Sequence, residues 1–453
     1  MTRRVLRAFV VSALMAAVSG MPVRAAVPPP KLQYDFSTLP NGLKVILSED
    51  HSSPIIHLGV YYHVGSKNER PGRTGFAHLF EHMMFKGSKN VGPEEHTSVI
   101  ASVGGQSNAY TTDDETVFWQ TFPAQYLPLV SWLEADRMAT LRVDKDTFTN
   151  EREVVKEERR MRVDNQPYGR LNELIYEQTF TTHPYKHPTI GSMADLEAAS
   201  VDDVRAFYNT YYVPENATLV IVGDFETAQA KALVEQYFGR VPKAPRPVPR
   251  DLPTEPAQTR EKRVTLQQPW PLPAVVVAYH ITYDGHPDSY PLHIASKVLS
   301  DGQSSRIYQK LVYEQQLAVT AFGGANLVED PNLFYAVAIV QPGQSPEAAI
   351  AALIGELDQL KTNGITEREL ERAKNQFARD YILGRESNQQ KALQLAHAVA
   401  IHNDITTADG EFEIFQTITA ADVKRVADTY FTEANRTVIT IMPASRAEAG
   451  GGR

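Results

Sequence analysis

Two stretches of this 453-residue sequence match each other without a gap, one in each half of the chain. Val204–Ile221 reads VRAFYNTYYVPENATLVI, and Val423–Thr440 reads VKRVADTYFTEANRTVIT. Each stretch predicts a helix, a turn and then a β-strand. Because the two units stand near the ends of the two halves, a duplication explains them better than chance does. We therefore expect two similar domains, which also suits a chain too long for one ordinary core.

A segment rich in proline and charge separates the two copies. Residues 241–262 read VPKAPRPVPRDLPTEPAQTREK, with few large apolar side chains. We interpret this segment as a semi-rigid linker between an N-terminal domain over residues 32–240 and a C-terminal domain over residues 263–444. In each domain, runs typical of antiparallel strands precede groups of residues with helical spacing. This order predicts an α+β fold class, with two α/β-sandwich-type domains whose mixed, largely antiparallel sheets carry helices on one side.

The N-terminus has the pattern of a secretory signal peptide over residues 1–25. Three arginines precede the apolar stretch Ala8–Met21, and small residues at Val23 and Ala25 suit cleavage after Ala25. The apolar stretch is too short for a stable membrane anchor, although a retained anchor is the alternative. The chain has no cysteine, and export without disulfides favours a bacterial periplasm.

The charge of the chain excludes one class of partner. The full sequence has a net charge of −9, and removal of the four arginines of the signal leaves 41 basic and 54 acidic residues, a net charge of −13. An acidic protein of this kind is a poor candidate for nucleic-acid binding.

Residues 78–82 read His-Leu-Phe-Glu-His, an H-x-x-E-H motif. On a helix His78 and His82 stand at i and i+4 and share one face, so both imidazoles can bind one Zn²⁺. Glu81 stands beside His82, where it can take a proton from metal-bound water. The alternative is a surface helix with two half-exposed histidines. The apolar neighbours argue against it, because they predict a buried helix on which unpartnered histidines would be costly.

A catalytic zinc site needs a third protein ligand and an open position for water. The segment Phe148–Met161 predicts a helix on which Glu151, Val154, Val155 and Glu158 share a stripe that should be buried. We assign Glu158 as the third metal ligand. Glu151 joins the catalytic machinery in a supporting role, orienting a histidine or the water. The alternative is a charged, solvated helix.

Together these features resemble the pitrilysin and mitochondrial-processing-peptidase family, the inverzincins, in their short two-domain bacterial branch. The resemblance covers nearly all of the chain after residue 25. It is carried by the motif, by the position of Glu158 further along the same half, and by three longer segments: Arg73–Ser88, Gly104–Thr116 and Asn150–Glu158.

The resemblance implies a zinc-dependent endopeptidase that hydrolyses peptides or small unfolded polypeptides inside a closed chamber of four such domains. Short chains pair to reach four domains. It also implies that Asn108, Ala109 and Tyr110 bind the substrate along an edge strand, which adds the substrate backbone as an extra strand. One Zn²⁺ is expected per chain.

One departure from the family pattern concerns the C-terminal half. Family members that complete their own site carry an Arg and a Tyr, seven residues apart, after a Ser-Arg-hydrophobic segment. Here that segment is Ser305–Ile307, and the pair would fall at Val312 and Val319. Valine can neither clamp a carbonyl nor stabilise an oxyanion. We therefore expect a heterodimer with a homologous subunit that lacks the zinc motif, in preference to a homodimer. Substitution by Tyr308 or Tyr313 is the alternative.

A non-catalytic assembly or scaffold subunit of the same family is the alternative function. Such relatives usually lose a ligand or the glutamate, whereas all four positions are intact here. The remaining histidines suggest no further site. Pro184 and Pro188 follow His183 and His187 and would break a helix there. We therefore expect these two histidines to be loop residues rather than ligands. The other nine histidines, His397 and His402 among them, form no second spaced set.

Overall fold

The computed structural model describes residues 29–444. The predicted signal peptide lies outside the described residues. Among those residues, no helix is both long and apolar enough to cross a membrane.

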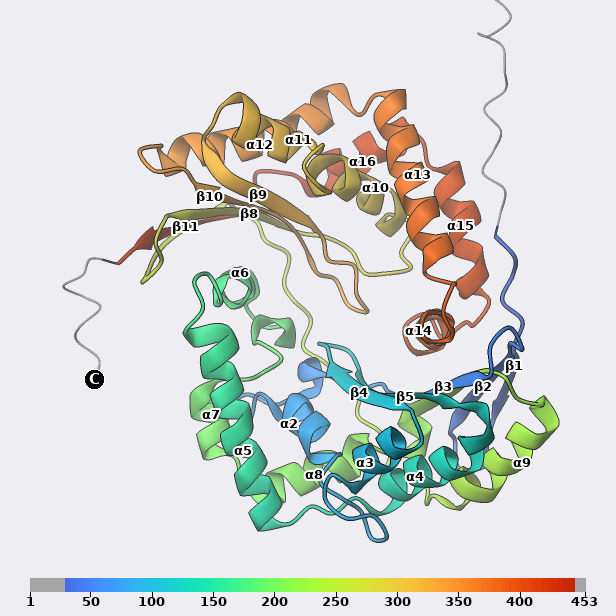
Figure 1. The fold of residues 1–453 in the computed structure, drawn as a ribbon. Helices are drawn as coiled ribbons and strands as arrows, with labels where there is room; N and C mark the ends of the chain where they lie inside the picture. The colour runs from blue at the N-terminus through green and yellow to red at the C-terminus, as the bar shows by residue number, and fades with distance from the viewer. Residues whose placement is uncertain (1–28, 445–453) are drawn as a thin grey trace, which may run out of the picture. The chain divides into compact units, whose positions relative to one another are not determined.

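The N-terminal half is built on a six-stranded sheet in the order β1-β2-β6-β3-β5-β4 (Figure 1). β2 and β6 run parallel, and every other neighbouring pair is antiparallel. β4 is therefore an edge strand. The strands are β1 (Asp35–Thr38), β2 (Lys44–Glu49), β3 (Ile55–Tyr62), β4 (Gln106–Thr111), β5 (Thr116–Pro123) and β6 (Ala217–Gly223).

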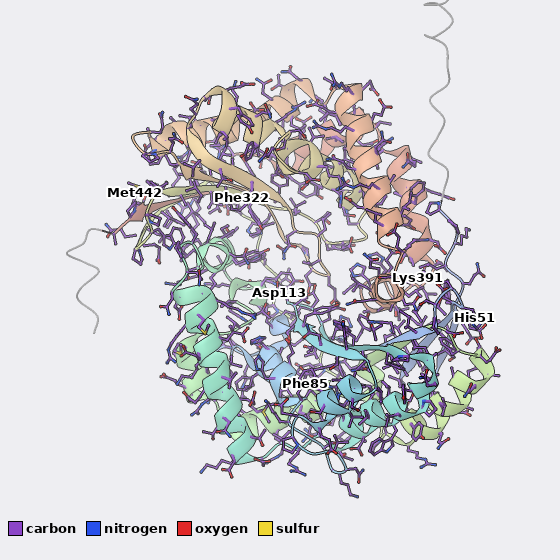
Figure 2. The ribbon with its side chains drawn as sticks, viewed as in Figure 1. His51, Phe85, Asp113, Phe322, Lys391 and Met442 are labelled. Carbon is purple, nitrogen blue, oxygen red and sulfur yellow. The ribbon has the colours of Figure 1, made fainter. Side chains whose placement is uncertain are left out.

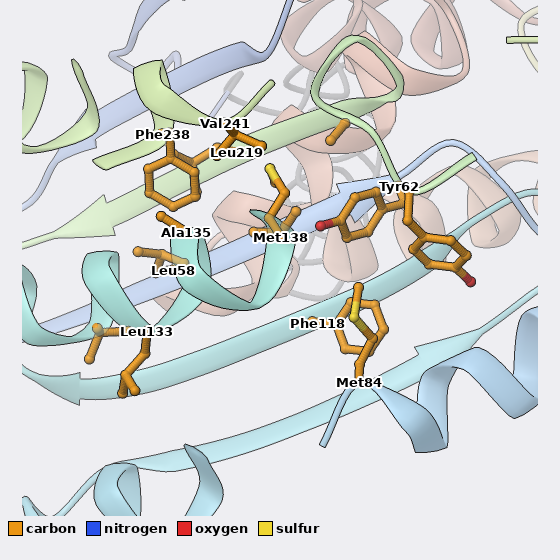
Figure 3. Close-up of a cluster of buried hydrophobic side chains, with 14 of the residues drawn as sticks. Leu58, Tyr62, Met84, Phe118, Leu133, Ala135, Met138, Leu219, Phe238 and Val241 are labelled. Atoms are coloured by element: carbon orange, nitrogen blue, oxygen red, sulfur yellow. The ribbon is translucent and has the colours of Figure 1, made fainter. Parts of the chain in front are cut away.

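Helices of the same half pack on one face of this sheet. Leu58, Phe118 and Leu219 of the sheet meet Leu133 and Met138 of α4 in one buried cluster (Figure 3). The α-helices of this half are α2 (Phe76–Met83), α3 (Glu95–Ser102), α4 (Leu127–Thr140), α5 (Lys145–Arg159), α6 (Leu171–Thr179), α7 (Met193–Ala198), α8 (Val201–Tyr211) and α9 (Thr227–Tyr237).

The C-terminal half repeats the arrangement with five strands in the order β7-β11-β8-β10-β9. β7 and β11 are parallel and the remaining pairs antiparallel, as for β2, β6, β3, β5 and β4. The strands are β7 (Lys262–Gln268), β8 (Ala274–His280), β9 (Ala318–Ala325), β10 (Leu333–Val340) and β11 (Arg436–Pro443). The α-helices are α10 (Ser289–Ser300), α11 (Arg306–Tyr308), α12 (Pro346–Asn363), α13 (Glu367–Leu383), α14 (Asn388–Ala400), α15 (Thr407–Thr417) and α16 (Ala420–Tyr430). The α+β class with two similar units is confirmed.

The matched sequence units adopt the same structure. α8 is followed by β6 as α16 is followed by β11, and the paired elements begin at equivalent positions of the two matching stretches. In the first unit the Asn216 side-chain amide donates to the carbonyl oxygens of Tyr211 (2.8 Å) and His63 (3.1 Å). In the second, Asn435 donates to those of Tyr430 (2.8 Å) and His280 (2.8 Å). The shared asparagine thus joins the helix end to the neighbouring strand in both copies.

The second face of each sheet is covered by a helix from the other half. Val220 and Val222 of β6 pack against Leu395 and Val399 of α14. In return, the apolar side chains of α6, Leu174 among them, pack against the C-terminal sheet. Each sheet therefore has helices of its own half on one face, as predicted, and a helix of the other half on its second face. Because α14 covers this second face, β6 is buried along its whole length.

Two local details differ from the sequence prediction. Val154 is 48% exposed and not part of the buried stripe, which runs through Phe148, Glu151 and Val155. Residues 241–261 form no helix or strand, and β7 begins at Lys262, the last residue of the predicted linker.

Candidate active site

The helix that carries the H-x-x-E-H motif has an unusual start. Gly75 precedes α2 with φ of 90°, and a Cβ at that position would lie 2.7 Å from the carbonyl oxygen of Ile190. Glycine has no side chain to cap the helix, and Glu69 takes that role. Its carboxylate accepts hydrogen bonds from the amides of Gly75 and Ala77, both at 2.8 Å. Burial raises the pKa of Glu69. This contact fixes the first turn of α2, the helix that carries both histidines.

His78, His82 and Glu158 lie together, as the sequence predicted. Oε2 of Glu158 is 3.6 Å from Nε2 of His78 and 3.2 Å from Nε2 of His82. The ligand atoms of the three residues all lie within 4.8 Å of one another. Neighbouring ligands of a tetrahedral zinc with bonds of about 2.0–2.1 Å are separated by about 3.3–3.4 Å. Two imidazoles and one carboxylate at these separations fit a zinc ion that keeps a fourth position open.

Two charged partners hold the glutamates of α5 in place. Oε1 of Glu158 is 2.6 Å from the Arg162 guanidinium, which leaves Oε2 to face the histidines. Glu151 lies 3.7 Å from Nδ1 of His82 and 3.2 Å from Nζ of Lys86. Burial opposes the ionised form of Glu151, but the contacts with His82 and Lys86 outweigh it and lower the pKa of that carboxyl. Glu151 thus faces Nδ1 of His82, while Glu158 faces Nε2 of the same ring.

Glu81 is held from the edge strand. The hydroxyl of Thr111, the last residue of β4, donates to Oε2 of Glu81 at 2.7 Å. Burial raises the pKa of Glu81. Thr111 also lines a cavity of about 360 Å³ together with His78, Asp113 and Glu158. Asp113, at the turn after β4, is labelled in Figure 2.

Asn108, Ala109 and Tyr110 lie on β4, at the edge of the N-terminal sheet. The amide of Ala109 donates to the side-chain oxygen of Asn108 at 2.9 Å. The Tyr110 hydroxyl donates to Glu115 at 3.1 Å. An edge strand has room for a further strand beside it.

The structure also shows the surroundings of Val312 and Val319, the positions where the family's Arg and Tyr would fall. Val312 lies in a π-helical turn over Gln309–Glu314, and Val319 lies on β9 with 43% of its surface exposed. Arg306 pairs with Glu369 at 2.7 Å. The rings of Tyr308 and Tyr313 pack against each other, with centroids 5.5 Å apart.

Sequence reasoning missed several residues that position the site. Arg162 stands four residues after Glu158, so helical spacing could have revealed it. Thr111 belongs to a segment that carried the family resemblance, but no role was assigned to it. Glu69 and Lys86 had no recognisable signal, because their partners are set by the tertiary fold.

The fold and this group of residues define a zinc metallopeptidase. The sequence profile described as "Insulinase (Peptidase family M16)" matches residues 44–193, and the profile "Peptidase M16 inactive domain" matches residues 198–377. The zinc protease PqqE of Helicobacter pylori is 30% identical over 414 residues, which are 91% of this chain and 93% of that protein. The uncharacterized zinc protease YmxG of Bacillus subtilis is 25% identical over 400 residues, covering 87% and 95% of the two chains.

Solved structures agree with these matches. The crystal structure of a protease from Helicobacter pylori superimposes with a TM-score of 0.87 at 30% identity, covering 91% of this chain and 100% of that one. The periplasmic protease PqqL of Escherichia coli has the same fold, with a TM-score of 0.74 at 18% identity, over 93% of this chain and 50% of that chain. This protein belongs to the insulinase family of peptidases, M16.

Proposed function

We propose that this protein is a zinc-dependent endopeptidase that hydrolyses peptides or small unfolded polypeptides. The observation that carries the proposal is the meeting of His78, His82 and Glu158 at ligand separations, with Glu81 in the same turn of helix. These three residues would hold one catalytic zinc per chain. Zinc bound there would supply the Lewis acidity that activates the attacking water and polarises the scissile carbonyl.

The chain's own residues would manage the protons. Glu81 would take the proton of the attacking water and pass it to the leaving amine. Thr111 holds one oxygen of Glu81 and leaves the other for the water. Glu151 would keep His82 oriented for the metal.

Substrate binding would use the edge strand. A peptide in extended form could pair with β4 at Asn108, Ala109 and Tyr110. The Ala109 amide is already satisfied by a neighbouring side chain, Asn108, which a substrate carbonyl could replace. Because β4 ends at Thr111, this pairing would direct the peptide towards Glu81.

A homologous partner subunit would complete the chamber and the site. Val312 and Val319 offer no group that could bind a carbonyl or an oxyanion, and Arg306 is engaged by Glu369. A match to only half of the PqqL chain is consistent with a second chain supplying the other half of a four-domain assembly. We propose a heterodimer whose partner lacks the zinc motif and contributes an Arg and a Tyr. The signal-like N-terminus supports a periplasmic location.

The test is hydrolysis of a quenched-fluorescent peptide of about 10–20 residues, long enough to pair along an edge strand. The purified protein is assayed alone, then mixed with the product of a neighbouring gene if that product is a homologous chain that lacks H-x-x-E-H. Activity that needs both chains and disappears with a chelator supports the zinc site and the heterodimer. Full activity of this chain alone supports the peptidase but overturns the heterodimer. No activity in the mixture, with zinc bound and both chains associated, overturns the peptidase itself.

A further inference from the structure

A second group of metal-ligand side chains lies in the C-terminal half, outside the site described above. Asp284, His397 and His402 place one ligand atom each within 4.8 Å of the others. The sequence indicated no second spaced set of histidines, and His397 and His402 stand five residues apart. The structure brings the two histidines together by a different route: His397 lies on α14, and His402 follows the end of that helix.

The geometry of this group resembles that of the catalytic group. Oδ2 of Asp284 is 2.7 Å from Nε2 of His397 and 3.2 Å from Nε2 of His402. The two imidazole rings have centroids 5.2 Å apart and an interplanar angle of 77°. The catalytic pair, His78 and His82, has centroids 4.9 Å apart and an angle of 72°. A shift of about 0.6 Å at the shorter contact would give the edge lengths of a tetrahedral zinc site.

The turn after β8 prepares Asp284 as a ligand. Oδ1 of Asp284 accepts a hydrogen bond from the amide of Gly285 at 2.9 Å, which directs Oδ2 towards both imidazoles. Gly285 has φ of +81°, and a Cβ there would lie 3.2 Å from the His402 ring. The Asp284 amide is fixed in turn by the carbonyl oxygen of Val328, at 2.7 Å.

The groups around the cluster orient His402 and leave a cavity beside both imidazoles. Nδ1 of His402 is 2.9 Å from the Thr407 hydroxyl, a contact that orients the ring with Nε2 towards Asp284. A cavity of about 280 Å³ borders both histidines and is lined also by Glu411. Burial and the charge of Asp284 raise the pKa of Glu411, and His402, His397 and Arg385 partly offset this effect. Burial opposes the charged form of His397, but Asp284 and then Glu115, from the N-terminal half, outweigh it and raise the pKa of His397.

We propose that Asp284, His397 and His402 form a second transition-metal site, suited to Zn²⁺. Two imidazoles and a carboxylate are ligands that zinc accepts, and the adjoining cavity leaves room for a water as fourth ligand. A metal ion here would join the turn after β8 to the end of α14. Since α14 covers the N-terminal sheet, the ion would brace the contact between the two halves. The inference does not depend on the peptidase proposal.

The experiment counts bound zinc by mass spectrometry of the purified protein, after any histidine tag is removed and excess Zn²⁺ is washed away. We expect two zinc ions per wild-type chain, one in a His78→Gln/His82→Gln variant and one in an Asp284→Asn/His402→Gln variant. The matched control is His51→Gln, because His51 pairs with Asp224 at 2.6 Å without a second histidine (His51 is labelled in Figure 2). This control should retain two ions.

A second measurement keeps the test independent of how the Asp284 variant folds. The His78→Gln/His82→Gln variant, whose second site is intact, is loaded with Co²⁺ and its visible absorption recorded. Bands of four-coordinate Co²⁺ support the proposal. One zinc ion per wild-type chain, with none in the His78→Gln/His82→Gln variant and no cobalt bands, would overturn it and leave the group as a hydrogen-bonded cluster without metal.

Discussion

The Thr111 hydroxyl donates a 2.7 Å hydrogen bond to the Glu81 carboxylate, and so joins the edge strand β4 to the helix that carries two of the proposed metal ligands. A peptide that pairs with β4 would lie beside this strand, whose last residue, Thr111, holds the proposed base, Glu81. The position of the substrate backbone and the position of the proton acceptor are therefore set by the same segment.

We predict that Thr111→Val lowers kcat/KM about tenfold and leaves zinc content unchanged. A hydrogen bond to a charged group is worth about 1.5–3 kcal/mol, and its loss frees Glu81 to leave its position. Steady-state kinetics on the quenched peptide, in the active assembly, would measure the effect. Thr149→Val is the control, because Thr149 bonds only within its own helix, to the carbonyl oxygen of Lys145 at 2.7 Å. Equal rates for both variants would contradict the role of Thr111.

Glu81→Gln should abolish most turnover and keep the metal. Loss of a general base typically costs about 10²–10⁴ in rate, whereas the zinc ligands are untouched. Zinc analysis and peptide hydrolysis on the same sample would measure both. Glu157→Gln is the matched control, since Glu157 lies on the ligand helix with its side chain 59% exposed. Near-normal turnover of Glu81→Gln would remove this residue from the role of base.

Glu69→Ala should destabilise the N-terminal half by about 2–4 kcal/mol, because it leaves two buried amides at the start of α2 without their acceptor. Chemical denaturation followed by circular dichroism would measure the free energy of unfolding. Glu69→Gln keeps one acceptor oxygen and should lose less. Equal free energies of unfolding for Glu69→Ala and Glu69→Gln would contradict the capping role of the Glu69 carboxylate.

Glu134 should make the fold sensitive to acid. Burial opposes its charge, but Arg137 and His96 outweigh that effect and lower its pKa from 4.5 to about 2. A carboxyl with a lowered folded pKa stabilises the protein above its unfolded pKa, and the stabilisation is lost as the pH falls from about 4.5 towards 2. The contribution at neutral pH is on the order of 3 kcal/mol.

Unfolding free energies measured between pH 7 and pH 3 would test this effect. Glu134→Gln should be less stable than the wild type at pH 7 and should lose less stability on acidification. Glu157→Gln, which removes an exposed carboxylate, should keep the wild-type slope. Parallel pH curves for Glu134→Gln and the wild type would contradict the prediction.

Local patterns in the sequence were sufficient for much of this protein. The match between Val204–Ile221 and Val423–Thr440 predicted two similar units, because a helix, a turn and a strand are each encoded by nearby residues. The spacing of His78 and His82 predicted a metal-binding helix face, since i and i+4 are neighbours on any helix. Glu158 was found by the same periodicity, although Val154 of the proposed stripe is exposed.

Tertiary structure alone decided the contacts between segments distant in sequence. Glu69 caps α2, Thr111 holds Glu81, and α14 covers the sheet of the other half. Asp284 meets His397 and His402 across a long stretch of intervening chain. Sequence periodicity records which face of a helix or strand is apolar, but it does not record which distant element that face will meet. Residues marked by helical spacing, Glu158 among them, were therefore predictable, whereas Glu69, Thr111 and Asp284 carry no such spacing and were placed only by packing between distant elements.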